Sequence, residues 1–505
     1  MSAVSALSAA SAGGADSSQR ILLAPRRIAV IGGGITGSVA ANHLSHHLSN
    51  CEVHVFDQGR RGPGGRASHR SVSKRHQTVL PDDDDENNDD DAATGEETSF
   101  EFDHGCQFFR ADSNDMQTEL LQSWLEKGWV APWKAKFGCL PTTTSTSNNP
   151  SHTSQDFFGI PTIQDKDVYI GVGGMHRLPR KILQDSAAIL HSKTRVARVE
   201  RNDNEAGRWN VHIVTGNAAY HDTKEKEAEG VSAVRFDEDF DAVIFTDISS
   251  ASDSWHRASA GIPDEFRHQL PPKVRIPLFS CMVALEGSSI GDQIPFDAFT
   301  TASSSDVLWF AAKSNSKPGF PSDSKNECWT LISTPSYAVQ QIKETTMRDP
   351  VTGAFQPQES DYLNSIPGPA LVEAFFNVVR AQIDATHSDN KFEPPNIVYL
   401  QAQRWGSGLP APETITADVQ DICGTRYAAT LTSSLVYPPP PPPAAAAVVE
   451  GGDSSLVQDF VMDDTLGLYY AGDFCSHRNP GFEAAALSGL NVAKYILTKS
   501  ALPTL

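Results

Sequence analysis

The chain has 505 residues, 39% of them hydrophobic, and a formal net charge of −21. This length allows a large buried core and predicts two or more domains. Much of the negative charge lies in one low-complexity segment, with acids at 82–86, 89–91, 96 and 97, so the remainder is far closer to neutral and leaves no basic surface for nucleic acid. No apolar run approaches the roughly 20 residues that a membrane-spanning helix needs. We therefore expect neither a nucleic-acid partner nor a membrane span.

Residues 1–25 are rich in Ser and Ala, and they lack the continuous apolar core of a secretory signal. This composition predicts a disordered tail, or a cleaved segment that directs the chain to a chloroplast or mitochondrion. The seven cysteines are scattered and odd in number, which favours neither a disulfide framework nor a metal site. We expect a cytoplasmic, reducing compartment and no bound metal.

Residues 27–37 join an apolar strand directly to a glycine-rich turn. Gly32 permits the tight turn, Gly34 lets the backbone approach a pyrophosphate, and Gly37 lets the next helix pack on the sheet. Ile35 and Thr36 open that helix, whose N-terminal amide groups and positive dipole end favour an anion. The spacing predicts a dinucleotide site.

A helix over residues 38–48 and a strand over 51–56 are expected next, and Asp57 closes that strand. A carboxylate at this place can accept hydrogen bonds from both ribose hydroxyls and repels a 2′-phosphate. The adenosine is therefore expected to belong to FAD or NAD rather than to NADP.

Residues 58–68, Gln-Gly-Arg-Arg-Gly-Pro-Gly-Gly-Arg-Ala-Ser, resemble the second motif of the amine-oxidase-like FAD superfamily. Plain NAD dehydrogenases lack this motif, so the resemblance favours FAD. Paired glycines bring the backbone near a cofactor, and guanidinium groups offer planar forks to phosphate oxygens. The resemblance implies cofactor contacts from Gln58, Arg60, Gly65 and Arg66.

Residues 102–109, Phe-Asp-His-Gly-Cys-Gln-Phe-Phe, resemble the D-x-G-x-Q-[YF]-F element of the renalase-like branch of that superfamily. Weaker matches to renalase-like proteins occur at 172–179, 309–319, 328–335 and 403–410. Together with the terminal motifs, the resemblance covers about two thirds of the chain.

Near the C-terminus, residues 468–473 read as a strand that ends in Gly472 and Asp473, and residues 479–489 resemble the superfamily's C-terminal flavin motif. The resemblance implies that Asp473 contacts the ribityl or pyrophosphate group. It also implies that the helix opening at Phe482, with Glu483 and Ala484, points its N-terminus at the flavin N1/C2 edge, where the dipole stabilises the negative charge of reduced flavin. The backbone of Val196 is expected to contact the adenine.

These anchors predict an α/β fold: a discontinuous, GR2-like Rossmann-type FAD-binding domain and a second, mixed α+β substrate domain. Residues 195–200 and 209–214 alternate as strands of a β-meander, residues 240–246 form the parallel strand that leaves it, and residues 369–383 form an amphipathic helix. The FAD-binding domain is expected over 26–115, 168–250 and 460–498, with an acidic disordered insertion at 71–99. The substrate domain is expected over 116–167 and 251–459, with a Pro/Ala-rich insertion at 438–452.

The sequence contains no Ser-His-Asp order, zinc spacing or P-loop, so the chemistry is expected to belong to the flavin. We expect a renalase-like FAD-dependent oxidoreductase that moves hydride from a small-molecule donor, a dihydronicotinamide or an amine, to flavin N5, with reoxidation by oxygen or another acceptor. No residue is placed for a flavin bond, which predicts noncovalent FAD. Two alternatives stay open, an amine or polyamine oxidase and a flavin-binding protein without turnover, and the sequence gives no oligomeric state. Candidates for the substrate face are His104, Cys106, Gln107, Trp405 and His477.

Overall fold

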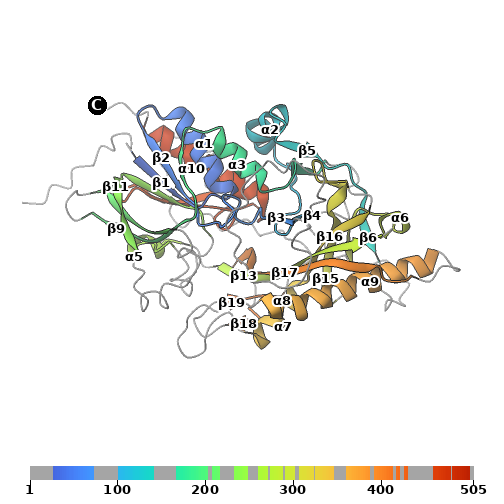
Figure 1. The fold of residues 1–505 in the computed structure, drawn as a ribbon. Coiled ribbons are helices and arrows are strands. Elements are labelled where there is room, and N and C mark those ends of the chain that lie inside the picture. The colour runs from blue at the N-terminus through green and yellow to red at the C-terminus, as the bar shows by residue number, and fades with distance from the viewer. Residues whose placement is uncertain are drawn as a thin grey trace, which may run out of the picture.

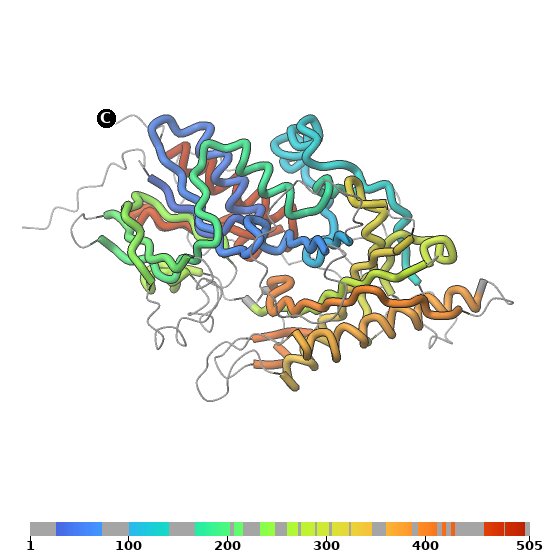
Figure 2. Tube along the Cα trace, in the orientation of Figure 1, coloured from blue at the N-terminus to red at the C-terminus, as the bar shows by residue number. Residues whose placement is uncertain are grey.

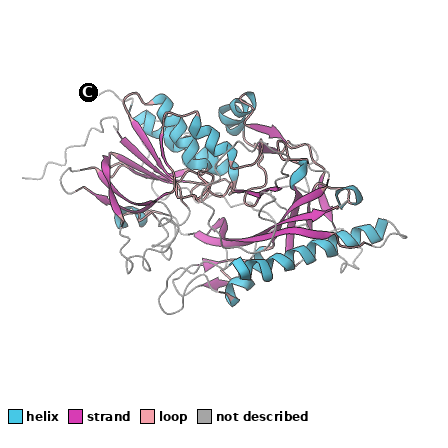
Figure 3. Cartoon of the chain, in the orientation of Figure 1, coloured by secondary structure: helices cyan, strands magenta, loops and turns pink. Residues whose placement is uncertain are grey.

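The structure is a computed structural model. It describes residues 27–72, 100–140, 167–202, 207–215, 233–247, 260–270, 273–287, 290–301, 306–322, 325–345, 360–386, 392–412, 417–420, 426–429, 459–478 and 480–500. Two large sheets lie beside each other, each covered by helices on its outer side (Figures 1 and 3). The expected tail 1–25, most of the insertion 71–99 and the insertion 438–452 lie outside the described residues.

The first sheet has six strands in the order β20-β21-β12-β1-β2-β8. All neighbouring pairs are parallel except β20 with β21. The four inner strands are short, largely buried apolar runs, as in parallel sheets generally, whereas the apolar side chains of the edge strand β8 are exposed. Their bounds are β1 Arg27–Ile31, β2 Glu52–Phe56, β8 Ile189–His191, β12 Ala242–Phe245, β20 Phe460–Asp463 and β21 Leu468–Ala471.

Helices cover one face of this sheet and a meander covers the other (Figure 1). The helices are α1 Ile35–His47, α3 Arg177–Gln184 and α10 Phe482–Ser500, and the meander comprises β9 Thr194–Arg201, β10 Trp209–Thr215 and β11 Val234–Phe240, with the short helix α5 Asp264–Arg267 against it. The first and last described helices, α1 and α10, lie side by side (Figure 2). They approach so closely that a Cβ on Gly489 would lie 2.2 Å from the Thr36 carbonyl oxygen.

The second sheet is built around the long strands β13 Lys273–Glu286 and β17 Asn396–Pro412, which pair antiparallel along their length. Along its other edge, β13 pairs with β16 Asn326–Ser333 and, at Arg275, with β19 Arg426–Tyr427. The sheet continues from β16 through β15 Leu308–Lys313, β14 Ala298–Thr301 and β6 Phe137–Leu140, and from β19 to β18 Val419–Gln420. The 20-residue helix α9 Pro367–Thr386 packs its apolar face on the outer side. Shorter helical segments complete this part: α6 Ile290–Gln293, the 3₁₀ turn η7 Ser314–Ser316, α7 Pro335–Glu344 and α8 Ser360–Ser365.

Small elements connect the two sheets. The hairpin of β3 His69–Val72 and β4 Phe100–Asp103 lies between them, and β5 Val130–Pro132 pairs with β7 Tyr169–Gly171 (Figure 1). The π-helical turn η2 Met116–Leu121 continues into α2 Gln122–Glu126. Ser71 and Val72, placed in the acidic insertion by the sequence analysis, belong to β3. Val72 is buried against Phe100 and Phe102, which the charge pattern alone does not reveal.

The α/β class with a Rossmann-type sheet and a second mixed part is confirmed. The predicted helix 38–48, strand 51–56, meander, parallel strand and helix 369–383 correspond to α1, β2, β9 to β10, β12 and α9, with bounds shifted by a few residues. In the described part of the chain, no helix is both long and apolar enough to cross a membrane.

Candidate functional site

The turn between β1 and α1 brings two glycines into tight contact and leaves a third open. Gly32 has a φ of +108°, and its N–H donates to the Phe56 carbonyl at 2.8 Å. A Cβ on Gly37 would lie 2.0 Å from the Gly32 carbonyl oxygen, whereas a Cβ on Gly34 would meet nothing closer than 3.9 Å. Gly32 and Gly37 are therefore required by the fold itself. Gly34 is the position where the backbone is open to a ligand.

Asp57 ties the first glycine turn to the loop that follows β2. Its carboxylate accepts the N–H of Gly33 and the N–H of Gly59, each at 2.9 Å. Burial raises the pKa of Asp57, and these hydrogen bonds oppose the rise. Each carboxylate oxygen has about two acceptor sites, so both oxygens retain capacity for a ribose hydroxyl.

The second glycine loop folds against the first. The Gly64 N–H donates to the Gly33 carbonyl at 3.0 Å, and Gly65, with a φ of +55°, lies so near that its Cβ would sit 3.4 Å from the Gly34 Cα. The two motifs thus face each other across Gly34 and Gly65. Gln58 and Arg60, also expected at the cofactor, lie exposed in the same loop.

Arg66 faces the C-terminal motif. Its Nη1 donates to Asp473 Oδ2 at 2.9 Å and to the Gly408 carbonyl at 3.3 Å, and its Nη2 donates to the other oxygen of Asp473. Burial lowers the pKa of this guanidinium, but the facing carboxylate outweighs burial and raises it. Arg66, expected to bind a cofactor phosphate, and Asp473, expected to contact the ribityl or pyrophosphate group, are therefore paired with each other.

The C-terminal motif forms a closely packed wall. The Gly472 N–H donates to Ser488 Oγ at 2.8 Å, and the Phe482 ring stacks on Phe109 with centroids 4.3 Å apart. Glu483 does not face the two glycine loops: its carboxylate accepts the N–H groups of Asp112 at 2.7 Å and Ser113 at 3.0 Å. Glu483 therefore positions the segment before η2.

The remaining cofactor candidates lie on elements next to these loops. Ala484 is buried in α10, and Thr36 Oγ1 donates to the Ala485 carbonyl at 2.9 Å, which joins α1 to α10. Ile35 is buried at the start of α1, and Val196 is buried in β9. The N-termini of α1 and α10 therefore lie next to each other, and β9 of the meander lies on the opposite face of the parallel sheet.

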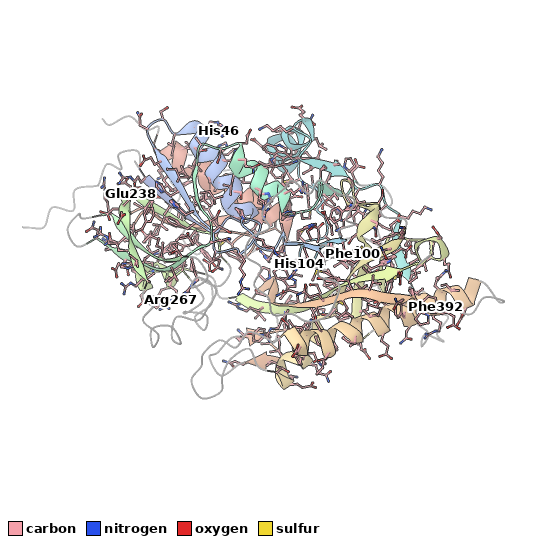
Figure 4. All side chains as sticks on the ribbon, in the orientation of Figure 1. His46, Phe100, His104, Glu238, Arg267 and Phe392 are labelled. Atoms are coloured by element: carbon pink, nitrogen blue, oxygen red, sulfur yellow. The ribbon has the colours of Figure 1, made fainter. Side chains whose placement is uncertain are left out.

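Two of the five substrate-face candidates contact each other directly. The rings of His104 and Trp405 stack with centroids 5.5 Å apart, and Trp405 Nε1 donates to the His104 carbonyl at 3.0 Å. His104 lies between the parallel-sheet part and the long strands β13 and β17 (Figure 4). Burial, followed by the charge of Arg70, lowers the pKa of His104 to about 3, so the ring is neutral at pH 7.

Cys106 and His477 have other environments. Burial raises the pKa of the Cys106 thiol to about 12, and its Sγ donates to the Phe108 carbonyl at 3.1 Å, so this half-buried group is a thiol rather than a thiolate. His477 lies on the C-terminal segment, with Nδ1 2.5 Å from Asp459 Oδ1. That carboxylate oxygen also accepts a hydrogen bond from Ser476 Oγ at 2.8 Å.

A buried ion pair that was not expected from the sequence holds the loop of residues 103–107. Lys317 Nζ is 3.0 Å from Asp103 Oδ2, and both side chains are completely inaccessible to solvent. Lys317 also donates to Gln107 Oε1 at 3.2 Å, and the Gln107 amide donates to the Asp103 and Gly105 carbonyls. Gln107, the remaining substrate-face candidate, is thus fully used in holding the loop. A lysine after an apolar strand, within Ser-Lys-Pro-Gly, was the only sequence signal.

The other oxygen of Asp103 faces two histidines. Asp103 Oδ1 accepts the Met175 N–H at 2.9 Å and lies 3.1 Å from His69 Nδ1. His176 stacks on His69 at 4.4 Å, and the ligand atoms of His69, Asp103 and His176 lie within 4.8 Å of one another. Burial alone would raise the pKa of Asp103, but Lys317 and His69 hold it below its ordinary value. The ammonium group of Lys317 already supplies the positive charge that a metal ion would bring to this carboxylate.

Comparison with known proteins identifies the first part of the chain. Residues 30–124 match the family model of the NAD(P)-binding Rossmann-like domain. A search among curated proteins finds no match. Among solved structures, the chain is similar to a protein from Exiguobacterium sp. 255-15 described as a protoporphyrinogen oxidase, with 11% identity, a TM-score of 0.49, and coverage of 94% of this chain and 100% of that one. The chain therefore contains a Rossmann-like dinucleotide-binding domain, joined to a second part built on a long antiparallel sheet.

Proposed function

We propose that this protein is a renalase-like, FAD-dependent oxidoreductase. The single observation that carries the proposal is the meeting of the two glycine loops at Gly34 and Gly65, with the Asp57 carboxylate and the Arg66–Asp473 pair beside them. A single dinucleotide turn accounts for Gly32, Gly34 and Gly37. The second loop resembles the motif that distinguishes the FAD superfamily from plain NAD dehydrogenases.

The residues present fit an FAD molecule. The backbone at Gly34 is open where a pyrophosphate would approach, and it lies at the N-terminus of the 13-residue helix α1. Asp57, fixed by Gly33 and Gly59, would accept the ribose hydroxyls. Gly472 and the start of α10 would border the flavin. When bound, the flavin supplies a hydride acceptor at N5.

The chain's own part in the reaction is to position the donor and exclude water. His104 and Trp405 form a stacked pair whose backbone is fixed to the second glycine loop, because the His104 N–H donates to the Ser68 carbonyl at 3.1 Å and the Cys106 N–H donates to the Arg66 carbonyl at 2.8 Å. The neutral His104 ring is held beside the expected flavin. Hydride transfer depends mainly on holding a donor carbon near N5, and this rigid segment is suited to that role.

Anaerobic reduction of the flavin tests the reaction class. We expect a reduced nicotinamide from a panel to bleach the flavin absorbance, and simple amines to leave it unchanged, with Gly34→Val protein as the cofactor-free control. Bleaching by amines alone, with peroxide released in air, would instead identify an amine or polyamine oxidase. Bound flavin that no donor reduces would identify a flavin-binding protein without turnover.

A further inference from the structure

Arg70 is a partly buried arginine without a described counter-ion. It lies in β3 opposite Phe102 of β4 and on the same face as Val72, which packs against Met282 of β13. This face is directed at the second sheet. Arg70 Nε is fully buried and has no hydrogen-bond partner, and burial lowers the pKa of the guanidinium to about 10. Within the described residues, no carboxylate pairs with it.

A second guanidinium, that of Arg61, is near enough for its charge to lower the pKa of Arg70. Arg61 is exposed in the second glycine loop, and its charge repels that of Arg70. The charges of both arginines also oppose the rise that burial causes in the pKa of Tyr399 of β17. Tyr399 is held in place because its ring stacks on Phe102 at 5.6 Å and its hydroxyl donates to Gln401 Oε1 at 2.7 Å. Like charges held together are unfavourable without an anion between them, and guanidinium forks match carboxylate and phosphate oxygens.

His104 adds a third polar group. It lies on the same face of the β3–β4 pair as Arg70, because Arg70 is opposite Phe102 and the His104 N–H donates to the Ser68 carbonyl at 3.1 Å. Its Nδ1 is buried without a partner. A buried polar atom left unpaired costs free energy. A neutral ring in this position can donate one hydrogen bond to an anion.

We propose that Arg61, Arg70 and His104 form a binding subsite for an anionic group, a carboxylate or a phosphate, of the substrate. This inference rests on the proposed function, because only that function makes the bound molecule a substrate. The segment that carries His104 is hydrogen-bonded to Arg66 and Ser68 of the second glycine loop, where the cofactor is expected, so an anion held there anchors a donor near the cofactor. It also disfavours polyamines, whose ammonium groups would meet two guanidinium groups.

The test is anion binding by the full-length, FAD-loaded protein, with inorganic pyrophosphate and malonate as separate probes in calorimetry. In FAD-loaded protein the cofactor's own phosphate site is filled. We expect Arg70→Met and Arg61→Met each to weaken binding at least roughly tenfold, since a charge-assisted hydrogen bond is lost, while flavin content stays at the wild-type level. Arg70→Lys is expected to lie between. The matched control is Arg235→Met, which removes an exposed arginine paired with Asp239 at 2.6 Å in the meander.

Three results would overturn the assignment. The first is equal binding in wild type and in Arg61→Met, whose exposed side chain is not needed for folding. The second is loss of flavin from Arg70→Met or Arg61→Met, which would assign the arginines to the cofactor. The third is anion binding only after residues 76–97 are replaced by a short linker, which would show that acidic residues of this chain occupy the two arginines. Because no turnover is measured, anion binding without flavin reduction contradicts the proposed function alone, and flavin reduction without anion binding contradicts this inference alone.

Discussion

Arg66 and Asp473 lie 407 positions apart in the sequence and form a two-pronged ion pair in the structure. The Asp473 side chain is completely buried and that of Arg66 is 30% exposed. Through the Gly408 carbonyl, the same guanidinium also reaches β17 of the second sheet. This pair therefore fixes the second glycine loop, the C-terminal strand and the second sheet relative to one another.

Removing one partner is expected to be more harmful than removing both. Arg66→Met leaves a buried carboxylate uncompensated and should lower the free energy of unfolding by about 3 kcal/mol. Arg66→Met with Asp473→Leu should recover part of that loss, and urea unfolding of both single variants and of the double variant measures this. A double variant as unstable as the sum of the single variants would show that the two residues do not act as a pair.

The glycine turn allows folding and cofactor binding to be separated. Gly34→Val should fold like wild type, because a Cβ there has open space and the φ of −73° suits any residue. It should not retain flavin, since the side chain fills the place of the pyrophosphate. Gly37→Ala should lose both, because its Cβ would overlap the Gly32 carbonyl. Circular dichroism and flavin absorbance decide the outcome, and flavin retention by Gly34→Val equal to wild type would exclude this site.

The buried pair of Lys317 and Asp103 should dominate the stability of the junction between the sheets. Lys317→Met is expected to cost about 3–5 kcal/mol in urea unfolding, since it leaves Asp103 charged and buried. Lys127→Met is the control, because its pair with Asp185 at 2.7 Å is at the surface, where such pairs contribute about 0–1 kcal/mol. Similar losses in the two variants would contradict the role given to Lys317.

Two histidines, the buried His104 and the half-buried His176, should make the protein acid-sensitive. Burial lowers the pKa of His104 and of His176 to about 3. Their folded-state pKa values lie below the unfolded value of 6.5, so their contribution to stability is present above pH 6.5 and is lost as the pH falls. As the pH falls from 6.5 towards 3, each histidine should lower the free energy of unfolding by about 1.4 kcal/mol per pH unit. The pKa of His69 is raised, because hydrogen bonds to Asp103 and Glu101 outweigh burial. His69 is therefore protonated in both the folded and the unfolded state below pH 6.5, and it does not change the free energy of unfolding there.

The variant His176→Phe tests this pH dependence. It keeps a ring against His69 and should reduce the loss of unfolding free energy between about pH 6.5 and about pH 5. His268→Gln, at an exposed position after α5, should leave the dependence as in wild type. An unchanged slope in His176→Phe would show that this histidine is not the titrating group.

The local elements were predictable from the sequence because their signals are local. Apolar runs, Gly32 and Gly37 specify β1 and α1 within a few residues, and the strand ending at Asp57 follows the same logic. The Lys317–Asp103 pair was not predictable, because its members lie 214 positions apart and meet only when both sheets are in place. Arg70 gave no signal either: a basic residue in a short strand looks solvent-exposed until the partner sheet covers it. Glu483 was expected at the cofactor as part of the N-terminus of α10, and that position stays a prediction. The binding of its carboxylate to two backbone amides was not predictable, because it depends on where residues 112–113 lie.

Cofactor released from the purified, heat-denatured protein and identified by chromatography and absorbance decides whether this chain binds FAD. We expect a yellow protein that releases close to one FAD per chain into solution, because binding is noncovalent and depends on the loops that meet at Gly34 and Gly65. Flavin that stays with acid-precipitated protein would contradict noncovalent attachment. Release of NAD alone, or no flavin after reconstitution with FAD, would contradict the assignment of the site.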